Sequence, residues 1–181
     1  MALTSTLYNF TIQLADVDRG VYESLAFKAA RHPSETEEYL LTRVLAYCLE
    51  YTEGIEFSRG LTEPDEPAIW VRDLTGALRA WIEVGAPDAA RLHKASKAAP
   101  RVAVYTHKGG PQLVRQLAGE RIHRAGALEL WALDRAMLAD LAGHLERRTA
   151  FDLSVTDRHL FISVGGETIT GTAERLTLPS A

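Results

Sequence analysis

Two short apolar runs, residues 67–73 and 78–84, flank the turn sequence Leu74-Thr75-Gly76-Ala77. Apolar runs on both sides of a glycine-containing turn are typical of an antiparallel β-hairpin. Counting outward from the turn sets Glu83 opposite Ala68, with a margin of about one or two residues in the register. This hairpin constrains the fold because it determines which residues meet at its open end.

Acidic residues stand at that open end. Asp65 and Glu66 precede the first strand, and Glu83 lies near the end of the second. Neighbouring carboxylates repel one another unless a cation compensates, and Mg²⁺ is commonly held by one or two carboxylates together with substrate phosphates. The pattern predicts a site for Mg²⁺ or Mn²⁺ with Asp65, Glu66 and Glu83 as ligands. The alternative is that Asp65 and Glu66 lie in a solvated loop while Glu83 points to water from an edge strand.

Two predicted helices bring further charged side chains to this site. Glu38 lies within roughly 20° of Leu45 on a helical projection, at the N-terminal end of an apolar stripe. Lys94 and Lys97 lie on the helix that directly follows the strand of Glu83. We expect Glu38 to support a metal or orient water, and Lys94, with Lys97 second, to stabilise transition-state charge. A solvated helix lysine is the common alternative.

The rest of the sequence predicts a single domain over residues 1–181, with a mixed sheet flanked by helices in an α/β or α+β fold. Ser34 with Glu37 three residues later predicts a capping box at the first helix. Helices are expected over residues 34–51, 89–99, 111–119 and 134–147, and strands over 101–106 and 127–133. Strands that alternate with helices indicate parallel crossovers. An N-terminal β-hairpin over residues 7–30 and a C-terminal three-stranded meander over 151–178 complete the sheet.

Composition limits the kinds of partner. A formal charge of −4 and a pI of about 5.9 argue against electrostatic attraction of nucleic acid to the whole surface, so such binding needs a local basic face. No apolar run approaches the ~18 residues that span a membrane, and residues 1–6 do not resemble a signal segment, so we expect a cytoplasmic protein without a membrane partner. Cys48 is the only cysteine, which excludes an internal disulfide.

Two features offer a local basic face, each with a plain alternative. The segment His107-Lys108-Gly109-Gly110 resembles a phosphate-cradling turn before a helix, but it lacks a nucleotide-binding fingerprint and also fits an ordinary strand-to-helix loop. Scattered basic residues either form a patch or lie separately in solvent. They are Arg91, His93, Arg115, Arg121, His123, Arg124, Arg147 and Arg148.

Five distinctive strings follow one another along this sequence. They are Ala30-Arg31-His32-Pro33-Ser34-Glu35-Thr36, Arg59-Gly60-Leu61, Asp65-Glu66-Pro67, Trp81-Ile82-Glu83 and Gly85-Ala86-Pro87-Asp88. In their order, and within a protein of the same size, these strings closely resemble the YaeQ family of bacterial proteins, and the likeness covers essentially the whole chain. The family is regarded as a variant of the PD-(D/E)XK nuclease-like superfamily. The resemblance therefore implies a mixed sheet flanked by helices and carboxylates that bind Mg²⁺.

Carried over to this sequence, the resemblance makes Asp65 or Glu66 the acid of the first strand and Glu83 the acid of the second, with Glu38 as the helix carboxylate. The sequence departs at Gly85, where the superfamily places a lysine two residues after the acid. Lys94 is the candidate replacement, with Lys97 second.

The resulting expectation is a Mg²⁺-dependent phosphodiester hydrolase of undefined substrate. The missing strand lysine and the acidic pI favour an alternative. In that alternative the nuclease-like fold is catalytically inactive and binds nucleic acid or a protein partner.

Overall fold

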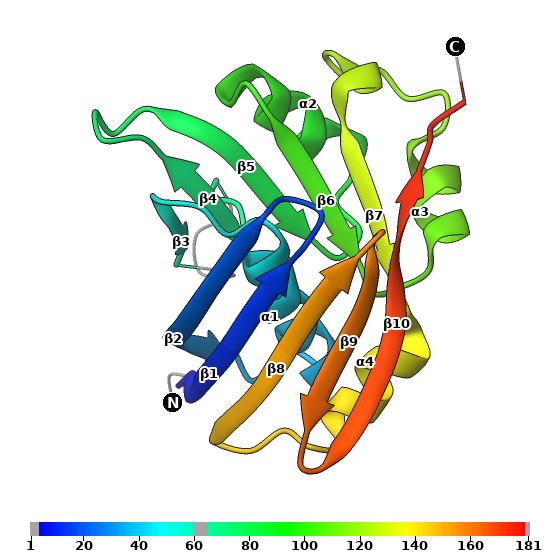
Figure 1. Cartoon of the computed structure of the whole chain (residues 1–181). Coiled ribbons are helices and arrows are strands. Elements are labelled where there is room, and N and C mark those ends of the chain that lie inside the picture. Colours follow the sequence, from blue (N-terminus) through cyan, green and yellow to red (C-terminus); the bar gives the residue numbers. More distant parts are fainter. Residues whose placement is uncertain (1–3, 60–64, 180–181) are drawn as a thin grey trace.

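The computed structural model describes residues 4–59 and 65–179, which form one mixed sheet and four helices. The ten-stranded sheet has the order β2-β1-β8-β9-β10-β7-β6-β5-β4-β3 (Figure 1). The helices are α1 (Glu37–Leu49), α2 (Ala89–Ala98), α3 (Gly110–Leu117) and α4 (Arg135–Ala142). The strands are β1 (Thr6–Asp16), β2 (Val21–Arg31), β3 (Ile55–Phe57), β4 (Ile69–Arg72), β5 (Leu78–Val84), β6 (Val102–Thr106), β7 (Glu129–Leu133), β8 (Arg148–Thr156), β9 (His159–Val164) and β10 (Glu167–Leu176).

The predicted strand pairings are confirmed. Strands β1 and β2 form the N-terminal hairpin, and β8, β9 and β10 form the C-terminal meander. Strand β4 pairs antiparallel with β5 and sets Ile69 opposite Ile82, so the same register continued by one residue brings Ala68 opposite Glu83. Strands β5, β6 and β7 run parallel, as the alternation of strands and helices predicts.

Two helix boundaries differ by three residues or more from the sequence-based expectation. Helix α1 begins at Glu37 rather than Ser34, because the Thr36 side chain caps it by accepting a 3.0 Å hydrogen bond from the Tyr39 amide. The Ser34 hydroxyl lies 2.7 Å from His32 Nδ1 instead, so the predicted capping box is wrong. Helix α4 ends at Ala142, five residues earlier than expected, because the chain turns there before entering β8.

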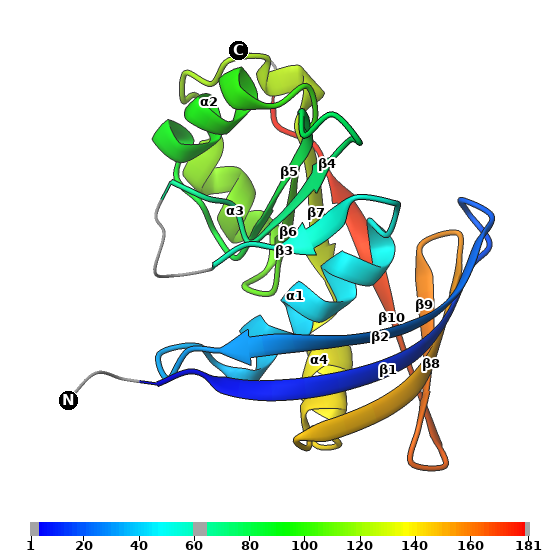
Figure 2. The same ribbon diagram turned by 90° about the vertical axis from the view of Figure 1, so that its left-hand side faces the viewer.

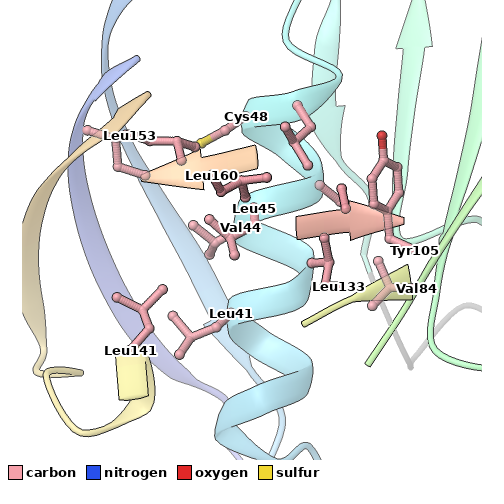
Figure 3. Close-up of a cluster of buried hydrophobic side chains, with 14 of the residues drawn as sticks. Leu41, Val44, Leu45, Cys48, Val84, Tyr105, Leu133, Leu141, Leu153 and Leu160 are labelled. Carbon is pink, nitrogen blue, oxygen red and sulfur yellow. The ribbon is translucent and has the colours of Figure 1, made fainter. Parts of the chain in front are cut away.

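The core is built around α1, over which the sheet curls (Figure 2). Nine of its thirteen residues are buried, whereas the sequence suggested a single apolar stripe. A helix buried on nearly all sides lies inside the core rather than on one face of a sheet. In Figure 3, Val44 and Leu45 project from α1 among side chains of several strands, including Leu153, Leu160 and Tyr105.

A second apolar cluster lies on the other face of the parallel strands, where α2 and α3 pack. Leu92 of α2 and Leu113 of α3 contact this cluster, which includes Trp81, Val104 and Leu130. The parallel strands are therefore covered on both faces and leave their carboxyl ends accessible for a ligand. In the described part of the chain, no helix has an apolar stretch of the length needed to cross a membrane.

Candidate functional site

A cleft of about 490 Å³ lies at the carboxyl ends of β5 and β6, where the sequence places the open end of the hairpin. Three helices begin around it: its walls include Thr36 before α1, Pro87 before α2, and Lys108 before α3. Glu66, Glu83 and other polar side chains line its interior. This cleft is the candidate functional site.

A neighbouring groove of about 590 Å³, the side groove, continues from the cleft. The cleft and the side groove share Thr36, His107 and Lys108 in their linings. The side groove adds Glu38 of α1 and Arg135 at the first turn of α4. The two hollows together form one continuous surface that passes the starts of α1, α3 and α4.

The three predicted metal ligands each contact a different cation. The Asp65 carboxylate pairs with Lys94, the Glu66 Oε1 atom lies 2.7 Å from Arg59 Nη2, and Glu83 Oε1 lies 2.8 Å from Arg91 Nε. Only Glu66 and Glu83 line the cleft. Within residues 4–59 and 65–179, no three His, Cys, Asp or Glu side chains are placed to hold one metal ion. The three acids do not form a preassembled three-ligand site, and binding of Mg²⁺ or Mn²⁺ by these residues stays a prediction.

Glu83 is a buried carboxylate at the end of β5. Its side chain accepts a 2.6 Å hydrogen bond from Trp81 Nε1 as well as the hydrogen bond from Arg91. Burial raises the pKa of Glu83 above its ordinary value of 4.5, although the Arg91 guanidinium acts in the opposite direction. Arg91 also donates from Nη2 to the main-chain oxygen of Glu66 at 2.6 Å. Glu83 therefore anchors Arg91 beside the loop that carries Glu66, and it does not point to water.

The expected helix residues lie in three separate places. Glu38 is half-buried and lines the side groove rather than the cleft, so the structure does not bring it to Glu83. Lys94 is exposed and contacts Asp65, and Lys97 is exposed further along α2. Their predicted catalytic roles stay untested predictions.

Sequence reasoning missed a second buried carboxylate, Glu35, in the wall of the cleft. Glu35 Oε2 lies 3.2 Å from Arg43 Nη2, and both side chains are at least nine-tenths buried. Burial raises the pKa of Glu35, and Arg43 opposes that shift. The signal in the sequence was Arg43, eight residues after Glu35. Arg43 stands among apolar helix residues, where a charged side chain needs a partner.

Two exposed cations, Lys108 and Arg135, line the side groove together with the half-buried acid Glu38. Among the described residues, neither Lys108 nor Arg135 forms an ion pair. Burial lowers the pKa of His107, and the positive charges of Lys108 and Arg135 lower it further, whereas the Glu38 carboxylate opposes the shift. The side groove thus has more positive than negative side chains in its lining.

The family model for YaeQ protein matches residues 1–173 of the chain. The chain belongs to the YaeQ family. YaeQ of Escherichia coli is 34% identical over 164 residues, which cover 90% of this chain and 91% of that protein. YaeQ of Salmonella typhi is also 34% identical over 164 residues, with the same coverage of 90% and 91%.

Two crystal structures of YaeQ proteins share this fold. The Pseudomonas syringae protein superposes with a TM-score of 0.84 at 33% identity, over 97% of each chain. The Xanthomonas axonopodis pv. citri protein gives a TM-score of 0.86 at 31% identity, over 97% of this chain and all of that one. The mixed sheet and its four helices thus represent the fold of YaeQ proteins.

In this YaeQ chain, the backbone at Gly85 explains the absence of a lysine two residues after Glu83. Gly85 has φ = +98°, a conformation that residues with a Cβ atom rarely adopt. A Cβ built there would lie 3.5 Å from the Tyr39 ring, in ordinary contact. Backbone strain rather than crowding therefore disfavours lysine at this position.

Proposed function

We propose that this YaeQ-family chain binds a single-stranded nucleic acid through the cleft and the side groove. The observation that carries the proposal is that the acids of the cleft form ion pairs whereas two nearby basic side chains form none with the described residues. The cleft acids Glu35, Glu66 and Glu83 each have a basic partner. Lys108 and Arg135 form no ion pair among the described residues, and the side groove that they line contains one acid, Glu38. A phosphodiester backbone supplies negative charges that these two side chains lack.

The helix termini add to this preference for an anion. The amino end of a helix carries partial positive charge and N–H groups that the helix itself does not use. The N-cap of α3 is Gly109, which provides no side-chain acceptor for those groups. Phosphate oxygens near Lys108 would therefore meet both an ammonium group and free amides.

Magnesium-dependent phosphodiester hydrolysis, with membership in the PD-(D/E)XK superfamily, is a second candidate. It is favoured by the position of Glu66 and Glu83 in the same cleft as the basic residues. It is opposed by the separate cation on each predicted ligand, because those ion pairs would have to break before the acids share a metal. We derive no hydrolytic step from this arrangement.

Binding is tested by fluorescence anisotropy with a labelled strand of about 12 nucleotides, as DNA and as RNA, over a range of salt concentrations. The double variant Lys108→Ala/Arg135→Ala is compared with Arg79→Ala/Arg148→Ala, which removes the same charge from exposed positions outside both hollows. We expect about tenfold weaker binding for the first variant and a salt slope smaller by about 1.4.

Equal affinities for the two double variants would contradict the proposal. Hydrolysis is separated from binding by adding Mg²⁺ or Mn²⁺ and following the length of the strand. Cleavage that requires the metal and is lost in Glu83→Gln would favour the hydrolase instead.

A further inference from the structure

A second group of basic side chains lies at the far end of α2 from the cleft. His93 and Lys97 lie four residues apart on α2, and Arg121 and His123 lie in the loop between α3 and β7. The amide of His123 donates a 2.9 Å hydrogen bond to His93 Nδ1, and the two rings meet edge to face at 6.3 Å between centroids. We call these four residues the α2 patch.

The α2 patch is held in place by Arg124. Its Nη2 atom donates to the main-chain oxygens of Ser96 and Ala99, the latter at 3.0 Å, at the carboxyl end of α2. This contact fixes the loop of Arg121 and His123 against the helix. The backbone contacts of Arg124 therefore hold the residues of the α2 patch together as an ordered surface.

Lys97 and Arg121 supply the fixed positive charge of the α2 patch. Burial lowers the pKa of His93, and Lys97, His123 and Arg121 lower it further, so His93 favours its neutral form and accepts the hydrogen bond from the His123 amide. In the described part of the chain, none of the four forms an ion pair, and Glu120 beside Arg121 is exposed without one. Two positive side chains without ion pairs among the described residues, held close to two imidazole rings in an acidic protein, point to an anionic ligand.

A row of basic residues on α2 connects the patch with the cleft. Arg91, which pairs with Glu83, lines the cleft. Lys94, which pairs with Asp65, and Lys97, which forms no ion pair among the described residues, follow at intervals of three residues along the helix. Six residues of helix correspond to about 9 Å, a length that two or three successive phosphates span. A strand that leaves the cleft along α2 would thus reach the α2 patch within a few nucleotides.

We propose that the α2 patch binds backbone phosphates of the same nucleic-acid strand, a few nucleotides beyond those bound in the cleft. The proposal rests on the proposed function. It adds a second contact region and so predicts that affinity depends on strand length. Contact by charge alone would make this region insensitive to base sequence.

The test compares labelled strands of about 3 and about 12 nucleotides by anisotropy at several salt concentrations. The variant Lys97→Ala/Arg121→Ala should bind the long strand about tenfold more weakly, with a salt slope smaller by about 1.4. Its affinity for the short strand should stay within about twofold of the unaltered protein, because the short strand occupies only the cleft. The control Arg79→Ala/Arg148→Ala should change neither affinity.

The outcomes separate the two proposals. Unchanged binding of the long strand by Lys97→Ala/Arg121→Ala would overturn the role of the α2 patch, and equal loss for both lengths would overturn the path from the cleft. If Lys108→Ala/Arg135→Ala has no effect while the patch variant weakens the long strand, the cleft proposal fails and the patch remains a binding region. An acidic peptide that competes better than the strand would identify a protein ligand and overturn the proposal.

Discussion

The basic side chains at the two ends of strand β6 differ in whether they form ion pairs. Before β6, the Arg101 guanidinium pairs with Glu50 at 2.7 Å and with Glu129 at 2.5 Å, and Tyr105 donates to Glu50 at 2.7 Å. After β6, Lys108 faces the cleft and the side groove without an ion pair among the described residues. The ion pairs of Arg101 stabilise the fold at the start of β6, whereas the Lys108 side chain after β6, unpaired in the described part of the chain, is available to a ligand.

The largest effect on stability should come from removing the Arg101 guanidinium and with it the ion pairs before β6. Arg101→Met leaves the buried Glu50 carboxylate and Glu129 without their cation, which should lower the free energy of unfolding by about 2–3 kcal/mol. This is less than for a fully buried pair, because the Arg101 side chain is 38% exposed and partly solvated. Lys108→Met, the matched change at the other end, should stay within about 0.5 kcal/mol. Urea denaturation measures both, and equal destabilisation would remove the distinction between the two ends.

A smaller effect is expected from the backbone of the cleft itself. Gly85→Ala forces a residue with a Cβ atom into φ = +98°, which should cost about 1–2 kcal/mol of unfolding free energy. Gly126→Ala is the control, because Gly126 has no positive φ and a Cβ there meets nothing within 4 Å. Both are measured by urea denaturation. Similar values for the two variants would mean that Gly85 is not required by its conformation.

Much of the fold follows from local sequence signals. The hairpin register at Glu83 and the helix that begins at Ala89 were predicted correctly, because each depends on residues close together in the chain. The all-round burial of α1 was not predicted. It depends on the pairing of β1 with β8, which joins Asn9 to Arg148 and lets the sheet curl over the helix. Pairing over that distance in sequence leaves no local pattern.

The candidate site was located from the sequence, but its charge pairing was not. Glu66 and Glu83 do lie at one cleft, as hairpin counting indicates. Their partners Arg59 and Arg91 come from other segments, and only tertiary packing decides which cation reaches which acid. Nothing in the sequence indicates that Arg135 belongs to the site, because a basic residue in the first turn of a helix is locally unfavourable and suggests no ligand.

The smallest effect on stability is expected from the titration of Glu83, a buried acid of the cleft. Burial raises its folded-state pKa above the ordinary 4.5, so the folded protein holds the proton at pH values where the unfolded chain has released it. Stability from this group is therefore lost as the pH rises from about 4.5 through the folded-state pKa. Trp81 and Arg91 both donate to Glu83 Oε1, so Glu83→Gln keeps one oxygen that can accept from both but removes the titration.

The difference in unfolding free energy between Glu83→Gln and the unaltered protein should accordingly shift in favour of the variant as the pH rises over that window. Urea denaturation at a series of pH values measures this difference. Glu35, a buried acid whose pKa is also raised, is present in both proteins, so its titration cancels from the difference. A difference that is flat with pH, or that moves against the variant, would mean that Arg91 stabilises the ionised carboxylate more than burial disfavours it. Glu83 would then be a compensated charge of the same kind as Glu50, and the contrast between the two ends of β6 would rest on Lys108 and Arg135 alone.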